Sequence, residues 1–193
     1  MTGYNTTIVQ SLLSLIPTHE TVRRIAPGET LGDAVKAERF VFAGGLLLGK
    51  AVNDYHDGDM ETVMQANYYW PVTLCEQILA ENPAARIVVL GSESGIKGSY
   101  DTVYAGAKAA LHKYVETKKL KPDQQLVCVA PSIIEDSGMT QRRQDLDNLE
   151  RRRREHPKGR FMKAEEVARL IHFLLYVDPG YISGTTIVMN GGA

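Results

Sequence analysis

The chain has 193 residues, a formal net charge of −1 at pH 7 and 44% hydrophobic residues. This length suits one domain, 1–193, with a sizeable core, and the near-zero charge supplies no bulk field that would recruit nucleic acid or an anionic membrane. The longest apolar run, 40–49, is too short to span a bilayer. Cys75 and Cys128 are expected to be buried thiols of a protein in a reducing compartment, the cytoplasm.

Three elements are predicted in the first quarter of the chain. Residues 8–16 are apolar at helical spacing, follow Thr and Asn, and stop at Pro17, which predicts a capped helix. Residues 21–26 are predicted to form a short strand because a Pro-Gly pair closes them. Residues 39–45 are mostly apolar and end in glycine, which predicts a buried strand.

Residues 61–79 have helical periodicity, which two residues interrupt. Asn67 is disfavoured inside a helix unless it has a specific task. Pro71 removes an internal hydrogen bond of the helix, so we expect a kink close to Asn67.

The next strand and helix carry the strongest chemical signal. The apolar strand 86–90 leads to Ser92, so this hydroxyl is expected at the carboxyl edge of a parallel sheet, where such folds bind ligands; Ser94 is a second candidate. Tyr104 and Lys108 are four residues apart and share one helix face. A cation beside a phenol favours the phenolate, so we expect Lys108 to lower the pKa of Tyr104. The alternative is a helix in which the Tyr-x-x-x-Lys spacing is incidental and has no catalytic role, since this motif alone is a weak signal.

The rest of the chain continues the alternation of helix and strand. The helix of Lys108 is predicted over 105–118, and His112 on it is expected at the surface or in an interface. Residues 125–131 predict a buried strand, and 164–175 predict an amphipathic helix before a last strand.

Residues 141–160 are strongly basic, with four consecutive arginines at their centre. Asp147 with Arg151, and Glu150 with Arg154, form i,i+4 pairs with the acid first, which is the favourable order. The segment is interpreted either as a solvated, salt-bridged helix or as a docking surface for an anionic substrate or phosphorylated carrier.

Taken in order, these motifs resemble the short-chain dehydrogenase/reductase family. The Ser-x-x-Gly turn, the Tyr-x-x-x-Lys pair and a tail ending in Asn-Gly-Gly resemble family motifs from Ser92 onward. Partial matches to the family's TGxxxGxG, NNAG and PGxxxT motifs are Thr2-Gly3, Ala43-Gly44 and Pro131. The strand that opens the family fold has no counterpart before Thr2 in this sequence.

The resemblance implies an α/β fold: a three-layer sandwich around a Rossmann-like, mainly parallel sheet that lacks the first family strand. That strand is central in the family, so something is expected to fill or close the gap. The basic segment 141–160 occupies the place of the family's variable lid. The family pairs the helices that correspond to 61–79 and 105–118, which implies a homodimer or homotetramer.

By resemblance the chain is an enzyme, an NAD(P)-dependent oxidoreductase that interconverts a carbonyl and an alcohol. Tyr104 would donate the proton, Ser92 would hydrogen-bond the carbonyl oxygen, and Lys108 would bind the nicotinamide ribose. The backbone carbonyl of Asn67 would hold a water in the proton relay. The substrate is expected to be a small carbonyl or alcohol compound, an anionic one if the basic segment takes part, and no metal is expected.

The cofactor site implied by the resemblance combines matched and altered positions. Two arginines at the end of the second strand favour NADP over NAD, although they also suit an exposed edge strand. Thr7 and Val9 stand where the family has glycines that let backbone approach a pyrophosphate. The expected cofactor residues are Gly3, Arg23, Arg24, Ala43, Gly44, Tyr104, Lys108, Pro131 and, through its backbone, Ile133.

A second hypothesis is a family member that has lost ordinary cofactor binding and serves as a binding or scaffolding subunit. The altered glycines favour this hypothesis. The complete Ser-Tyr-Lys-Asn set favours the enzyme, because a scaffold need not keep all four residues.

Overall fold

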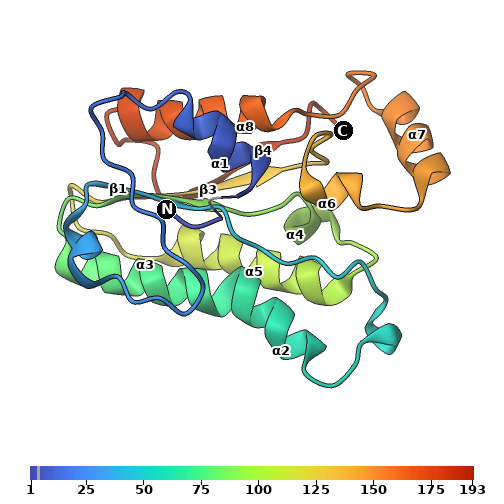
Figure 1. Ribbon diagram of the computed structural model, residues 1–193, viewed down its shortest axis with the longest axis horizontal. Helices are drawn as coiled ribbons and strands as arrows, with labels where there is room; N and C mark the ends of the chain where they lie inside the picture. The colour runs from blue at the N-terminus through green and yellow to red at the C-terminus, as the bar shows by residue number, and fades with distance from the viewer. Residues whose placement is uncertain (4) are drawn as a thin grey trace.

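The computed structural model describes residues 1–3 and 5–193. Its centre is a sheet of four parallel strands in the order β1-β2-β3-β4 (Figure 1). The strands are β1 (Arg39–Phe42), β2 (Arg86–Leu90), β3 (Gln125–Pro131) and β4 (Thr185–Met189). Parallel neighbours need crossover connections, and helices lie in each of them.

Helices cover both faces of the sheet (Figure 1). Below it, as drawn, lie α2 (Asp59–Met64), α3 (Trp70–Glu81) and α5 (Thr102–Thr117). Above it lie α1 (Thr7–Leu13) and α8 (Ala164–His172). The prediction of a three-layer α/β sandwich with a Rossmann-like parallel sheet is therefore confirmed.

Shorter elements decorate this frame. Helix α7 stands apart from the sheet at one end of the molecule (Figure 1). The remaining helical pieces are α4 (Ser94–Lys97), α6 (Gly138–Gln141), α7 (Leu146–Glu155), two 3₁₀ turns (Gly32–Lys36 and Val52–Asp54) and two π-helical turns (Gln65–Tyr69 and Phe173–Val177).

The strands are buried on both faces because successive side chains point to opposite sides of the sheet. One apolar cluster joins Val88 and Val127 to α1 and α8. The other joins Ile87 and Leu126 to α3 and α5. The continuous apolar runs in the sequence are what a sheet covered on both faces requires.

A π-helical turn lies between α2 and α3, at the place near Asn67 where we expect a kink. The N–H of Trp70 donates to the carbonyl of Gln65, five residues back instead of four. Pro71 accounts for the change, because it has no N–H to give the carbonyl of Asn67 four residues earlier.

The strand predicted over 21–26 is wrong, since these residues lie beside Met1 without forming a strand. The Met1 amino group donates to the carbonyl of Arg23 at 2.8 Å, and the N–H of Ile25 donates to the carbonyl of Met1 at 3.0 Å. A strand needs several consecutive residues that pair with a neighbouring strand through backbone hydrogen bonds, and Met1 supplies one such residue.

Met1 and Thr2 bridge the gap expected beside β1. The N–H of Thr2 donates to the carbonyl of Val41 at 2.8 Å. A cavity of about 380 Å³ remains along the same edge of β1, lined in part by Met1, Leu12 and Ile16. The gap beside β1 is therefore closed near the carboxyl end of that strand, and the cavity occupies the rest of it.

Candidate active site

Helix α5 presents one face to the carboxyl end of β2. Asp101 caps the start of the helix, and its side chain accepts the N–H of Tyr104 at 3.0 Å. Tyr104, Lys108 and His112 follow at intervals of four residues, so they form a row on one face. All three are buried, with exposed fractions of 7%, 3% and 5%.

Ser92 lies beside Tyr104, and its side chain is the buried hydroxyl of the turn after β2. The alternative, Ser94, begins α4 and donates its backbone N–H to the Ser92 hydroxyl at 3.2 Å. Burial raises the pKa of Tyr104, the interaction with Ser92 lowers it, Asp101 raises it, and the net direction is upward. The phenol is therefore held protonated at neutral pH.

The expectation that Lys108 lowers the pKa of Tyr104 is wrong for this arrangement. The ammonium nitrogen lies 5.8 Å from the centre of the Tyr104 ring and donates to the carbonyl of Leu90 at 2.7 Å. Burial lowers the pKa of Lys108 to about 8. The net direction of the Tyr104 pKa is upward, and burial of the phenol is its largest cause.

Asn67 is fully buried beside Lys108, and its side chain fixes the loop that follows β1. Its Oδ1 accepts the N–H of Leu46 at 3.2 Å, while its Nδ2 donates to the carbonyls of Leu46 at 2.7 Å and Val63 at 2.8 Å. A Cβ at Gly45 would lie 2.9 Å from Asn67 Oδ1 and 3.5 Å from Lys108 Nζ. Glycine therefore lets this loop approach both side chains.

Asp101 ties the same loop to α5. Its side chain accepts the N–H of Gly49 at 3.0 Å and the hydroxyl of Tyr55 at 2.5 Å, in addition to the N–H of Tyr104. Burial, followed by the hydrogen bond to Asp101, raises the pKa of Tyr55, so this hydroxyl stays a donor. One carboxylate thus fixes both the loop and the start of the helix that carries Tyr104.

The expectation that His112 lies at the surface or in an interface is wrong. Its ring is buried under the turn after β2, and its Nε2 accepts the N–H of Ser92 at 3.3 Å. The sequence reasoning assigned His112 no role at the site. Its spacing of four residues from Lys108 was the available signal, because that spacing places it on the same face of α5.

The expected cofactor residues at the end of β1 do come together. Gly3 has a φ of +66°, and a Cβ there would lie 2.5 Å from the backbone of Ala43. The N–H of Gly44 donates to the hydroxyl of Thr2 at 3.3 Å. The amino-terminal loop and the loop after β1 therefore meet at the carboxyl edge of the sheet.

The first turn of α1 differs from a bare glycine loop. The Thr6 hydroxyl accepts the N–H of Val9 at 3.3 Å, and Thr7 is the first residue of the helix. A side chain of this chain thus takes one of the amide donors at the helix start.

Arg23 and Arg24 lie on the far side of Met1 from β1. The guanidinium of Arg23 pairs with Glu29 at 3.3 Å, and both side chains are about half exposed. A hydrogen bond from the Ala26 backbone, followed by the pairing with Arg23, lowers the pKa of Glu29. Met1 and β1 lie between these two arginines and β2, the strand that leads to Ser92.

The segment after β3 has its own structural bonds. Pro131 ends the strand, and the carbonyl of Ile133 accepts the N–H of Met162 at 3.2 Å. Any cofactor contact through the Ile133 carbonyl would share that oxygen. Asp136, at the position of the family's threonine, accepts the N–H of Ala164 at 2.8 Å and caps α8.

Glu93 is a second residue that the sequence did not single out. It follows Ser92, is 9% exposed and pairs with Lys97 at 2.9 Å. Burial raises its pKa, but interactions with Ser132, Lys97 and Asn190 lower it, and the net direction is downward. The carboxylate therefore stays ionised where the ends of β2, β3 and β4 meet.

Several charged side chains of the basic segment 141–160 form salt bridges with each other along α7. The expected pair of Glu150 and Arg154 is present at 3.9 Å. Arg151 pairs with Glu155 at 3.6 Å, so the expected pair with Asp147 is wrong. These exposed pairs favour the interpretation as a solvated helix.

One arginine fastens α7 to the body of the protein. Arg153 reaches Glu135, in the loop after β3, at 2.8 Å, and its guanidinium lies 5.4 Å from the centre of the Phe161 ring. The helix is thus attached near the carboxyl edge of the sheet.

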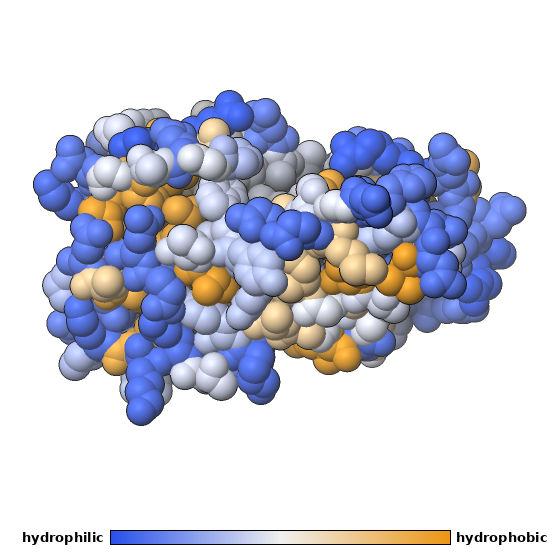
Figure 2. Space-filling view, turned by 90° about the horizontal axis from the view of Figure 1, so that it is seen from below, coloured by the Kyte–Doolittle hydropathy of each residue, from blue (hydrophilic) through white to orange (hydrophobic). Residues whose placement is uncertain are grey.

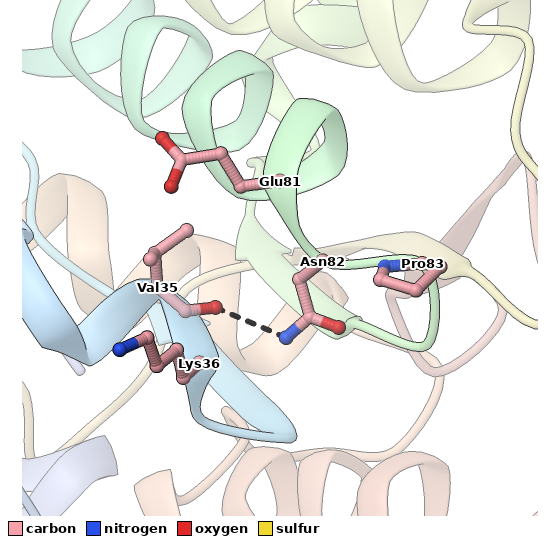
Figure 3. A pocket seen from close by; sticks show the side chains of 5 residues that line it. All are labelled: Val35, Lys36, Glu81, Asn82 and Pro83. Atoms are coloured by element: carbon pink, nitrogen blue, oxygen red, sulfur yellow. Dashed lines mark hydrogen bonds between the residues drawn. The ribbon is translucent and has the colours of Figure 1, made fainter.

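A pocket of about 260 Å³ lies at the opposite edge of the sheet (Figure 3). The side chain of Asn82 donates to the carbonyl of Val35 at 3.0 Å across it. Val35 precedes β1 and Asn82 precedes β2, so the pocket lies at the amino ends of the strands, away from Ser92.

Cys75 and Cys128 are free and buried, as predicted. Across residues 1–3 and 5–193, no three His, Cys, Asp or Glu side chains are grouped to hold a metal ion. The helices in this described part of the chain are each too short or too polar to cross a membrane.

The profile of the family described as enoyl-(acyl carrier protein) reductase matches residues 39–193, which is most of the chain. The chain belongs to the short-chain dehydrogenase/reductase family.

It is 31% identical over 184 residues to the rhamnolipids biosynthesis 3-oxoacyl-[acyl-carrier-protein] reductase of Pseudomonas aeruginosa, covering 88% of this chain and 71% of that protein. It is 33% identical over 113 residues to the 3-oxoacyl-[acyl-carrier-protein] reductase FabG of the same organism, covering 55% and 44%. These relatives are reductases by name, and the chain spans less than half of the second one.

Solved structures show the same fold at lower identity. A short-chain oxidoreductase from Burkholderia thailandensis matches with a TM-score of 0.85 at 18% identity, covering 99% of this chain and 90% of that one. A 3-oxoacyl (acyl-carrier-protein) reductase from Agrobacterium tumefaciens with NADP bound matches with a TM-score of 0.81 at 18% identity, covering 100% and 92%.

Proposed function

We propose that this protein reduces the ketone of a 3-oxoacyl thioester to an alcohol with NADPH. The observation that carries the proposal is the buried cluster of Ser92, Tyr104 and Lys108 at the carboxyl edge of the sheet. Named relatives that reduce 3-oxoacyl groups on carrier proteins support the substrate class.

Tyr104 is the proton donor in this mechanism. Its pKa is not lowered toward neutrality, so the phenol is protonated at neutral pH, which is the state that reduction of a carbonyl requires. Ser92 lies beside it, and its hydroxyl would donate a hydrogen bond to the same carbonyl oxygen as negative charge develops there.

Lys108 and Asn67 prepare the site around that donor. The Lys108 ammonium donates to the Leu90 carbonyl and lies near the loop at Gly45, and it would hydrogen-bond a ribose hydroxyl there. Pro71 has no N–H to give the Asn67 carbonyl four residues earlier, and this carbonyl would hold a water in the proton relay.

The fit to a dinucleotide differs between its two ends. At the reactive end, a phenol, a serine hydroxyl and an ammonium converge, and this donor set suits a ribose and a carbonyl. At the other end, Gly3 packs on the backbone of Ala43, while Thr6 caps α1 with its own hydroxyl. When bound, the reduced nicotinamide would supply the hydride, and the protein's residues orient the carbonyl and move the proton.

The position of α7 supports a substrate on an anionic carrier. Arg153 attaches this basic helix near the carboxyl edge, where Ser92 also lies. Arg151 and Arg154 are exposed and pair with neighbours on the same helix, and a phosphate or an acidic surface would replace these weak pairs.

The test measures NADPH consumption with acetoacetyl groups carried on coenzyme A and on an acyl carrier protein. We expect turnover of both, with a lower KM for the carrier protein. The triple variant Arg151→Ala, Arg152→Ala and Arg154→Ala should raise KM for the carrier substrate and leave the coenzyme A reaction nearly unchanged. If neither NADPH nor NADH binds in calorimetry and no turnover occurs, the scaffolding hypothesis replaces this one.

A further inference from the structure

We infer that His112 is a positioning residue: as a neutral imidazole it holds the backbone of Ser92 in place, and protonation of the ring releases that backbone. This inference rests on the proposed reductase function, because the group that His112 would aim is the Ser92 hydroxyl. Every contact that it uses is made within the protein.

The hydrogen bond requires one protonation state of the ring. Nε2 of His112 accepts the N–H of Ser92 at 3.3 Å, so the ring proton must be on Nδ1. An imidazolium carries N–H groups on both nitrogens and has no acceptor, so protonation would set two N–H groups against each other.

The ring has little room to move away from that contact. A Cβ at Gly91 would lie 2.3 Å from Nε2, and a Cβ at Gly95 would lie 2.7 Å from Cε1. Neither glycine has a positive φ, so the need for glycine at both positions is one of space. The ring is thus enclosed by the residues on each side of Ser92, and a change in the ring is transmitted to the turn that carries the hydroxyl.

The groups that face the imidazole keep it neutral near pH 7. Burial, followed by the Lys108 ammonium, lowers its pKa, whereas Glu116 raises it, and the net direction is downward. On β3, burial raises the pKa of the Cys128 thiol to about 12, so this neighbour is uncharged. Glu93, the residue before α4, pairs with Lys97 on that helix. The ring should therefore take up a proton only in acid.

The first test is the pH dependence of kcat in His112→Gln and His112→Met. Glutamine offers an amide oxygen to the Ser92 N–H without titrating, so kcat should stay near the original value and lose its decline on the acid side. Methionine removes the acceptor, so kcat should fall about tenfold at all pH values, the size expected for one lost hydrogen bond, with KM for NADPH unchanged. His19→Gln, at an exposed site, should keep the original profile.

An acid decline that persists unchanged in His112→Gln would overturn the inference, as would an unimpaired His112→Met. Should the methionine variant fail to fold, the glutamine profile alone decides. NMR gives a readout that needs no substrate: the amide signal of Ser92 should shift as the His112 ring titrates. If that coupling is present but no ketone is reduced, the proposed function fails and the contact stands; if the amide signal does not follow the ring, the inference fails.

Discussion

The Lys108 ammonium donates a hydrogen bond to the carbonyl of Leu90 at 2.7 Å, which links the helix of Tyr104 to the strand that leads to Ser92. Tyr104 and His112, one helical turn to each side, meet the Ser92 turn that follows this strand. The spacing of four residues on α5 thus sets the spacing of the candidate active site. A buried amine is costly, and its pKa of about 8 records that cost.

The burial of Lys108 predicts a rise in stability with pH. Between about pH 8 and the ordinary lysine value of about 10.4, the unfolded chain holds a proton that the folded chain lacks. The free energy of unfolding should therefore rise across this window, by up to about 1.4 kcal/mol per pH unit. Urea unfolding of the original chain and Lys108→Met should show this pH-dependent difference. Lys113→Met, on the exposed side of α5, serves as control, and parallel curves for the original chain and Lys108→Met would contradict the prediction.

Tyr104→Phe should abolish proton donation without unfolding the protein. Loss of a general acid typically lowers the rate about 10²- to 10⁴-fold, and the phenyl ring keeps the packing of the buried side chain. The measurement is NADPH-dependent ketone reduction beside a thermal melt. Tyr100→Phe is the matched control, because Tyr100 is 72% exposed. Equal rates for Tyr104→Phe and the original chain would remove Tyr104 from the mechanism.

Asp101→Ala should destabilise the protein and make the loop around Gly49, beside the candidate site, more mobile. The carboxylate caps α5 and also accepts the Gly49 N–H and the Tyr55 hydroxyl, and loss of a helix cap alone costs about 0.5–2 kcal/mol. Hydrogen exchange should accelerate in the loop around Gly49 more than in the sheet. Asp123→Ala, at an exposed site, should change neither quantity. A variant whose loop exchanges at the original rate would show that Asp101 does not hold it.

The layers of the fold follow from patterns within the sequence, whereas the amino-terminal edge does not. Strands such as 86–90 and 125–131 are continuous apolar runs, and burial on both faces makes them unambiguous. Residues 21–26 have a strand composition, but a strand also depends on the number of partner residues beside it, and Met1 supplies one rung. The sequence of a segment does not show how many residues of a neighbouring strand are available to pair with it.

The site was predictable in its residue types and not in its electrostatics. The turn at Ser92 and the pair of Tyr104 and Lys108 could be placed because helix and strand periods fix their faces. Burial could not be read from spacing, and burial sets the direction of both pKa shifts. His112 was misassigned for the same reason: its neighbours Gly91 and Gly95 are close only in the folded chain.

We predict a homo-oligomer that pairs the helices below the sheet. Figure 2 looks onto the underside of the molecule, which α3 and α5 cover, and shows separate hydrophobic patches among hydrophilic side chains. Met60 and Tyr69, on α2 and the π-helical turn, are 48% and 42% exposed. Sedimentation should give a dimer or tetramer at micromolar concentration, and Tyr69→Glu should weaken it. A monomer of the original chain would contradict the prediction.

Binding of NADPH should be weaker than is usual in the family, because Thr7 and Val9 replace two glycines and Thr6 already caps α1. Gly3→Ala should abolish the remaining binding, since the new Cβ would lie 2.5 Å from the Ala43 backbone at a φ of +66°. Calorimetry with NADPH and NADH measures both effects. Gly159→Ala, at another positive φ but with open space around it, controls for backbone strain alone.

The preference between the two nucleotides tests the arginines separately. Arg23 is about half exposed and pairs with Glu29, so any contact of it or of Arg24 with a 2′-phosphate would be charge-assisted and screened by salt. Each such bond typically contributes about 1.5–3 kcal/mol. The preference for NADPH should fall as salt rises, and Arg23→Ala with Arg24→Ala should erase it while leaving NADH affinity nearly unchanged. Tight binding of NADH that does not respond to salt would contradict both the altered phosphate loop and the role of the arginines.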